Sequence, residues 1–229
     1  MKNAPHTVRI WDLPTRLFHW VLAASVVGLV VTAKLGGNAM EWHFRLGHLV
    51  LALLVFRIVW GLIGGRWSRF AAFVYSPGRL LRYLRGTPHA EDGVGHSPLG
   101  ALSVFALLAA LVAQVATGLL SDDEIAFAGP LTRFVSNAVV GQATGYHKEI
   151  GQYLVLGLLG LHIAAILFYV VVRRQRLVRP MLSGDKHLEA PAAPSRDDAA
   201  MRVVALVVLL LSLALAWWVS SLAAVAASF

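Results

Sequence analysis

Five long apolar runs dominate this sequence and constrain its fold more than any other feature. A helix of about 20 mostly apolar residues crosses a hydrocarbon core of roughly 30 Å. The predicted spans are residues 17–33, 44–63, 98–120, 150–172 and 203–229. Hydrophobic residues make up 58% of the chain and charged residues 14%, against roughly 45–50% and 25% in soluble domains. The sequence therefore predicts an all-α membrane protein and excludes a soluble or disordered chain.

The basic residues and the absence of cysteine narrow the possible functions. Twenty Lys and Arg against twelve Asp and Glu give a formal charge of +8. These charges fall between the apolar runs instead of clustering on a soluble face, so we expect no nucleic-acid partner. The chain has no Cys, which excludes disulfides, Cys-ligated iron–sulfur clusters and the CxxCH attachment of a c-type haem. Any cofactor is therefore held without cysteine sulfur.

The distribution of Lys and Arg predicts the orientation of the chain in its membrane. The N-terminal segment and the stretches 64–97 and 173–202 contain fifteen of these residues, whereas the alternate loops 34–45 and 121–149 contain four. The positive-inside rule therefore places the N-terminus in the cytoplasm. Five crossings then place the C-terminus outside.

The chain divides into a core and an appended span. Residues 189–200 (EAPAAPSRDDAA) have the composition of a flexible linker. We expect residues 1–186 to form a four-helix transmembrane bundle and residues 202–229 to form an additional transmembrane helix. Residues 187–201 are expected to connect the two as a flexible linker.

Four histidines fall at two depths of the predicted bundle. His43 and His147 open the second and fourth spans at the outer side, and His19 lies near the cytoplasmic end of the first span. His162 follows His147 by fifteen residues, which is about 22 Å along a helix. Ionisable residues inside a bilayer are costly and usually functional. Two histidines at each depth, from different helices, are what two bis-histidine haems stacked across the membrane require.

Small residues follow three of these histidines at the same spacing, i to i+4, which places both members on one helix face. The pairs are His43–Gly47, His147–Gly151 and His19–Ala23. A porphyrin against that face leaves no room for a large side chain one turn along. The alternative is that the small residues only allow close helix packing. The repetition at three candidate ligands favours haem binding.

His48 and Arg57 on the second span have different predicted roles. His48 is five residues after His43 and points about 140° away around the helix, so we expect it to hydrogen-bond within the bundle. Arg57 is fourteen residues after His43 and returns to nearly the same face, about 21 Å deeper. It is a candidate partner for a propionate of the inner haem. The alternative is that its side chain extends to the inner interface.

An ordered set of motifs covers the chain from residue 8 to about residue 186. The stretches are VRIWDLPTRLFHW (8–20), EWHFRLGHLVLALLVFRIVWGLIG (41–64), RFAAFV (69–74), GHSPLGALSVFALL (95–108) and YHKEIGQYLVLGLLGLH (146–162). This set resembles the prokaryotic cytochrome b561 family, which includes the b subunits of nickel–iron hydrogenase and formate dehydrogenase. In that family the four haem ligands occupy the positions held here by His19, His43, His147 and His162. The fifth span departs from the family's four-helix core.

The resemblance implies an electron-transfer cytochrome b of a respiratory chain, with two non-covalent b haems whose iron is bound by these histidines. Electrons would pass between a periplasmic partner, such as a cytochrome c or a dehydrogenase subunit, and quinone in the membrane. The outer haem (His43 and His147) would face the partner. The inner haem (His19 and His162) would serve the quinone.

Two residues near the inner haem are candidates for a quinone site. Arg16 lies three residues before His19 on an adjacent part of the helix face, and His96 precedes the third span at the same depth. An imidazole with an ordinary pKa suits proton exchange with a reduced quinone. The alternative is that both residues bind propionates or lipid phosphates.

Two other functions stay open at this point. One is a stand-alone oxidoreductase of the same fold, which oxidises superoxide and passes the electron to quinone. The other is a non-redox membrane scaffold with incidental histidines. Whether the chain is an enzyme by itself or a subunit is left open by the sequence.

Overall fold

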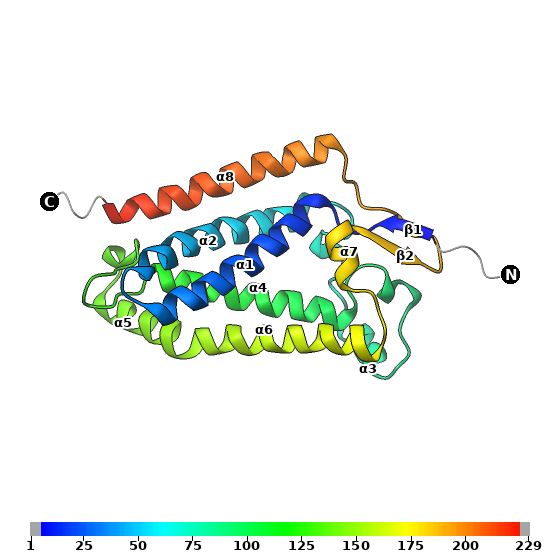
Figure 1. Ribbon diagram of the computed structural model, residues 1–229, viewed down its shortest axis with the longest axis horizontal. Helices are drawn as coiled ribbons and strands as arrows, with labels where there is room; N and C mark the ends of the chain where they lie inside the picture. Colours follow the sequence, from blue (N-terminus) through cyan, green and yellow to red (C-terminus); the bar gives the residue numbers. More distant parts are fainter. Residues whose placement is uncertain (1–5, 225–229) are drawn as a thin grey trace. The chain divides into compact units, whose positions relative to one another are not determined.

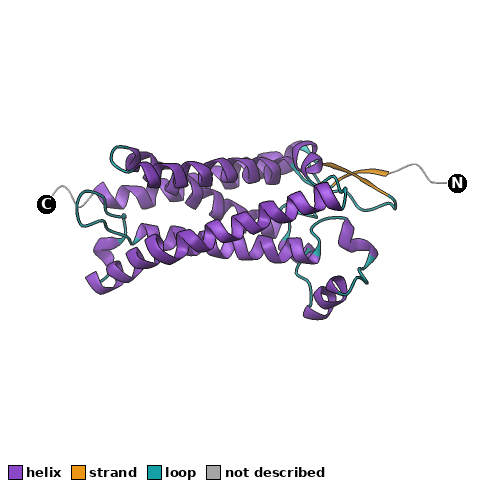
Figure 2. Ribbon diagram, turned by 60° about the horizontal axis from the view of Figure 1, so that its bottom comes forward, coloured by secondary structure: helices purple, strands orange, loops and turns teal. Residues whose placement is uncertain are grey.

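The computed structural model describes residues 6–224 and is dominated by helices (Figures 1 and 2). The helices are α1 (Leu13–Leu35), α2 (Ala39–Ile63), α3 (Pro77–Leu84), α4 (Pro98–Leu119), α5 (Asn137–Gly145), α6 (Gln152–Leu167), α7 (Val178–Ser183) and α8 (Ala199–Ala224). Two π-helical segments, Tyr146–Gly151 and Phe168–Val172, flank α6. Short 3-10 turns occur at Phe70–Ala72, Ala90–Gly93 and Thr132–Phe134. The strands β1 (His6–Arg9) and β2 (Asp185–Leu188) pair antiparallel.

The described residues contain five helical stretches that are long and apolar enough to cross a membrane. α1, α2, α4 and α8 correspond to four of the five predicted spans; the end of the last prediction, 225–229, lies outside the described residues. The remaining span differs from the prediction, because the helical stretch is Asn137–Val172 rather than 150–172. Residues 137–149 are polar enough to end an apolar run, but they contain no proline and continue the helix through α5 and the first π-helical segment.

The apolar side chains of these helices are mostly exposed. In the most apolar 18-residue stretch of each span, between 6% and 44% of the residues are buried within the protein. A soluble protein rarely exposes apolar surface on this scale. The surface is therefore matched to lipid, as the composition predicts.

The chain forms two compact units, and α1, α2, α4, α6 and α8 contribute residues to both. Unit 1 comprises Met1–His19, Arg57–Ala106 and Leu161–Val208. Unit 2 comprises Trp20–Phe56, Leu107–Gly160 and Leu209–Phe229.

Unit 2 is a four-helix packing around a small apolar core. Its buried residues come from α1, α2, α4 and α6: Val26, Val50, Leu54, Ala110, Leu111 and Val155. Contacts among helices in lipid depend on close packing of such side chains rather than on exclusion of water. This core sets the positions of the helix segments that carry His43 and His147.

Unit 1 is organised around the buried carboxylate of Asp12, which is 0% exposed. Its oxygens accept hydrogen bonds from the Thr15 backbone N–H at 2.9 Å, the Gly65 N–H at 3.1 Å, the Ser68 hydroxyl at 2.7 Å and the Trp60 indole N–H at 3.3 Å. The bond to Thr15 caps the start of α1, and the others connect that start to the end of α2. A buried carboxylate is stable in such a place only because so many donors satisfy it.

The stretch expected to be a flexible linker is attached to unit 1 by hydrogen bonds. Ser195 donates through its hydroxyl to the Ile10 carbonyl at 2.7 Å, and the Trp67 indole donates to the Ala193 carbonyl at 2.8 Å. Asp197 forms an ion pair with Arg9 at 2.7 Å. These bonds attach residues 193–197 to Trp67 and to the segment beside β1. The end of β2 and the first residues of α8 also fall within 187–201.

Candidate functional site

In unit 2, His43 of α2 faces His147 of the first π-helical segment. Their ring centroids are 6.2 Å apart and the ring planes are perpendicular. Metal–imidazole bonds are about 2 Å long and each ring centroid lies about 1 Å behind its nitrogen, so one metal between two imidazoles holds the centroids about 6 Å apart. π-helical turns are frequent at functional sites. The separation fits a single iron between the two rings.

A backbone carbonyl on another helix orients each ring. The Nδ1 of His43 donates to the Leu29 carbonyl of α1 at 3.0 Å, and the Nδ1 of His147 donates to the Gln114 carbonyl of α4 at 2.9 Å. A carbonyl only accepts, so each Nδ1 carries the proton and each Nε2 keeps its lone pair. Metal-binding histidines are commonly oriented in this way. Both rings are therefore prepared to bind a metal through Nε2.

The glycines around this pair have different surroundings. A side chain at Gly118 would begin 2.8 Å from Cε1 of His147, so the glycine makes room for the ring. At Gly47 nothing lies within 4 Å of where a side chain would begin, as expected for the face that a porphyrin covers. At Gly151 a side chain would collide with Gln114 and Tyr146. The spacing predicted space at both Gly47 and Gly151, but at Gly151 close packing is the better description.

The donor set at this pair matches an iron that already has four ligands. Porphyrin nitrogens supply four ligands in a haem, and His43 and His147 would supply the remaining two. Across residues 6–224, no three His, Asp or Glu side chains converge on a common metal position. The arrangement therefore fits haem better than a zinc site, which needs at least three protein ligands.

His19 of α1 and His162 of α6, the other two candidate ligands, both belong to unit 1. The Nδ1 of His162 also lies 3.4 Å from the Ser103 hydroxyl of α4. The two histidines come from different helices, like the pair in unit 2. The four candidate ligands thus divide into one pair in each unit.

Basic side chains surround the histidines of unit 1. Arg57 is 3% exposed, and its guanidinium carbon lies 4.6 Å from the centre of the Phe70 ring. Its Nη1 is buried without a hydrogen-bond partner among the described residues, and so is Nε of Arg16. Lys186 of β2 extends toward the same region, where its ammonium donates to the carbonyls of Gly93 and Val94. A buried guanidinium is costly without an anion, so these side chains suit the carboxylates of a haem.

His96 is enclosed by aromatic rings. Its ring centroid lies 4.6 Å from that of Trp11 and 4.3 Å from that of Phe73. Burial, followed by the charges of Arg57 and Lys186 and the nearby His19, holds the pKa of His96 well below its ordinary value. The imidazole is therefore neutral at pH 7. A neutral ring donates or accepts a hydrogen bond, whereas the proton exchange expected from an ordinary pKa does not follow.

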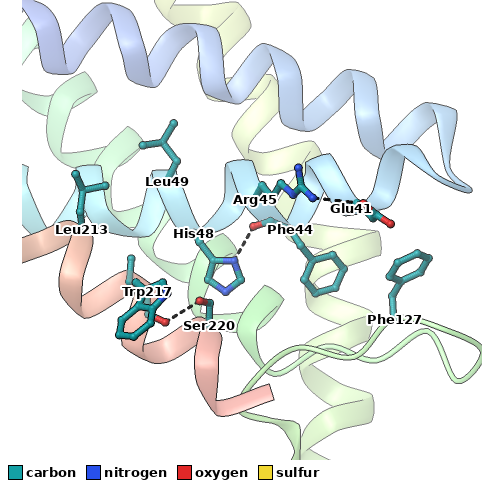
Figure 3. A pocket seen from close by; sticks show the side chains of 10 residues that line it. Glu41, Phe44, Arg45, His48, Leu49, Phe127, Leu213, Trp217 and Ser220 are labelled. Carbon is teal, nitrogen blue, oxygen red and sulfur yellow. Dashed lines mark hydrogen bonds and ion pairs between the residues drawn. The ribbon is translucent and has the colours of Figure 1, made fainter. Parts of the chain in front are cut away.

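His48 lies on α2 but takes no part in the pair formed by His43. Its Nδ1 donates to the Phe44 carbonyl of its own helix at 2.8 Å. Figure 3 shows the ring directed toward Trp217 and Ser220 of α8. The structure thus separates His48 from His43, as their five-residue spacing predicts.

Three features of the site were missed from the sequence. Gly118 and the Gln114 carbonyl both position His147, and Lys186 joins the basic group around His96. Gln114 had a usable signal in its side chain, which is the one amide in this span and donates to the His147 carbonyl at 3.0 Å. Gly118 and Lys186 had none, since glycine is common in membrane helices and Lys186 stands in a polar segment.

Comparisons with known proteins give one family and one group of relatives. The sequence model of the family described as prokaryotic cytochrome b561 matches residues 10–184. A probable Ni/Fe-hydrogenase B-type cytochrome subunit of Azotobacter vinelandii is 26% identical over 215 residues, covering 77% of this chain and 87% of that protein. Proteins of the same description from Bradyrhizobium diazoefficiens and Cupriavidus necator are each 25% identical, covering 79% and 76% of this chain and 86% and 85% of their own lengths. No solved structure matches the chain significantly. α8 lies outside the residues matched by the family.

Proposed function

The chain belongs to the prokaryotic cytochrome b561 family, and we propose that it carries electrons between a partner outside the inner membrane and the quinone pool through two bis-histidine haems. Family membership makes it a multi-pass membrane cytochrome b that binds haem. Beyond this we propose the number of haems, their ligands, the orientation of the chain in the membrane and the two redox partners.

The observation that carries the proposal is the His43–His147 pair. Two rings 6.2 Å apart, each with Nδ1 donating to a carbonyl of another helix, leave two Nε2 lone pairs available for one iron. His19 and His162 would hold the second haem. Bound haem iron accepts and releases one electron at a time, which is the chemistry that the protein itself lacks.

The residues of unit 1 adjust the second haem and its surroundings. Arg57, Arg16 and Lys186 bring positive charge and hydrogen-bond donors to the region of His19. They would bind the haem carboxylates and, by their charge, favour the reduced iron. Arg16 and the neutral ring of His96 would also provide hydrogen bonds to a quinone at this end.

The orientation and the partner rest on charge and on the relatives. Fifteen Lys and Arg in the segments beside unit 1 against four in the alternate loops support a cytoplasmic position for unit 1. The relatives are described as hydrogenase cytochrome subunits, which favours a catalytic redox subunit as the outer partner over a stand-alone superoxide:quinone oxidoreductase. Family membership removes the support for a non-redox scaffold.

The test of the ligands is haem content per chain in single variants. His43→Ala or His147→Ala is expected to leave one haem of two, and His19→Ala or His162→Ala is expected to leave the other. His48→Ala is the matched control on the same helix and is expected to keep both. A wild-type protein with one haem, or a His48→Ala variant that loses haem while His43→Ala does not, contradicts the assignment.

A further inference from the structure

A cavity of about 610 Å³ lies between the first turns of α2 and the last turns of α8 in unit 2 (Figure 3). Cavities of this size typically hold small molecules. Its lining includes Phe44, His48, Phe127, Trp217 and Ser220. Because α8 lies outside the residues that the family model matches, the cavity is not a property of the shared four-helix core.

His48 supplies the polar feature of this cavity. Its Nδ1 donates to the Phe44 carbonyl, so its Nε2 is an acceptor. That Nε2 is buried and has no hydrogen-bond partner among residues 6–224. A buried acceptor without a donor is destabilising, because it loses its hydrogen bond to water and gains none in return. Residues 6–224 therefore supply no donor to this nitrogen.

The other walls indicate the shape of what supplies the donor. Phe44 and Phe127 are stacked with centroids 5.8 Å apart, and the indole of Trp217, on α8, is 73% exposed. Glu41 and Arg45, whose charged groups lie 3.6 Å apart, also line the cavity. A flat apolar ring with polar groups at its edges suits aromatic walls, one buried acceptor and a neighbouring ion pair.

We propose that this cavity binds the ring of a membrane hydroquinone, with one hydroxyl donating to Nε2 of His48. A phospholipid chain fills the same apolar space but brings no hydroxyl donor to that nitrogen, so the hydroquinone fits better. The inference rests on the proposed exchange of electrons with quinone. It adds a second site for that substrate class in unit 2, apart from Arg16 and His96 in unit 1.

The experiment measures binding rather than turnover. The full chain is placed in lipid nanodiscs, and reduced decylubiquinone is partitioned between these and empty discs of the same lipid under anaerobic conditions. His48→Leu removes the acceptor and is expected to weaken binding at least tenfold. The dimethyl ether of the same hydroquinone has no O–H donor and is expected to bind wild-type protein as weakly as the hydroquinone binds the variant.

A pair of serines on α8 provides a matched control that leaves His48 intact. Ser220 and Ser221 make the same local bond, each hydroxyl donating at 2.7 Å to the carbonyl three residues earlier, but only Ser220 lines the cavity. Ser220→Phe is expected to abolish the His48-dependent binding, and Ser221→Phe to leave it unchanged.

Three results would overturn the inference. The first is equal binding by wild type, His48→Leu and Ser220→Phe. The second is equal binding of the dimethyl ether and the hydroquinone. The third is a co-purified phospholipid that Ser220→Phe excludes and the hydroquinone does not displace. Haem spectra of the same samples test the proposed function separately, because the binding measurement does not depend on haem.

Discussion

Gly118 provides the sharpest test of how His147 is positioned. A Cβ at this place would lie 2.8 Å from Cε1 and 3.2 Å from Nδ1 of the His147 ring. Ordinary van der Waals contact begins near 3.4 Å, so Gly118→Ala requires the ring to move by about 0.6 Å. Metal–ligand distances tolerate only about 0.2 Å. We therefore expect this one methyl group to weaken haem binding in unit 2 and to leave haem binding in unit 1 unchanged.

The magnitude follows from overpacking. Inserting a methyl group into a filled site costs about 1–3 kcal/mol, which corresponds to a roughly tenfold to hundredfold loss of haem affinity if the ring alone moves. Haem content is measured by pyridine haemochrome against protein concentration, and the reduced spectrum reports which haem is lost. Gly157→Ala is the matched control on α6, because nothing lies within 4 Å of its Cβ position. A Gly118→Ala protein with two haems and unchanged reduction potentials refutes the argument.

Three further predictions concern unit 1. Arg57→Leu removes a buried positive charge. Two unit charges on the order of 10 Å apart interact by about 1–2 kcal/mol at an effective dielectric of 20, so the substitution should lower the reduction potential of one haem by on the order of 50–90 mV in a redox titration. The exposed Arg45→Leu is the control and should change neither potential. Arg16→Ala and His96→Ala should each slow quinol-driven haem reduction about tenfold in samples that keep both haems, and an unchanged rate in both removes these residues from the quinone site. Asp12→Ala leaves donors on Thr15, Gly65, Ser68 and Trp60 without their acceptor, and should destabilise the protein by about 2–4 kcal/mol in thermal unfolding. The exposed Glu189→Ala is the control and should leave the melting temperature unchanged.

The parts of the fold that depend on apolar length were predictable from the sequence. α1, α2, α4 and α8 follow from runs of apolar residues, because lipid accepts only such segments as spans. Residues 137–149 were assigned to a loop because their polarity ends the run. The helix continues there because backbone hydrogen bonds within it do not depend on apolar side chains. A polarity criterion finds spans and not the extensions of their helices.

The parts that depend on contacts between distant residues were not predictable. His43 and His147 were expected at the same depth, but the carbonyls of Leu29 and Gln114 that orient them belong to helices whose rotation no spacing reveals. The linker around Ser195 was assigned to solvent from its composition. The hydrogen bonds between this segment and residues near β1 form only when the chain folds back, so composition alone does not predict them.

His43 and His48 lie five residues apart on one helix but belong to two different sites. Both rings donate from Nδ1 to a backbone carbonyl and keep Nε2 as an acceptor. The carbonyl that orients His43 lies on α1, and its ring faces another imidazole; the carbonyl that orients His48 lies one turn back on α2, and its ring faces α8. Chemistry therefore does not distinguish the two side chains, but their surroundings do. We therefore expect the two substitutions to have opposite effects. His43→Leu removes a haem and keeps hydroquinone binding, whereas His48→Leu removes hydroquinone binding and keeps the haem. A variant at either position that loses both would show that the two functions share one site.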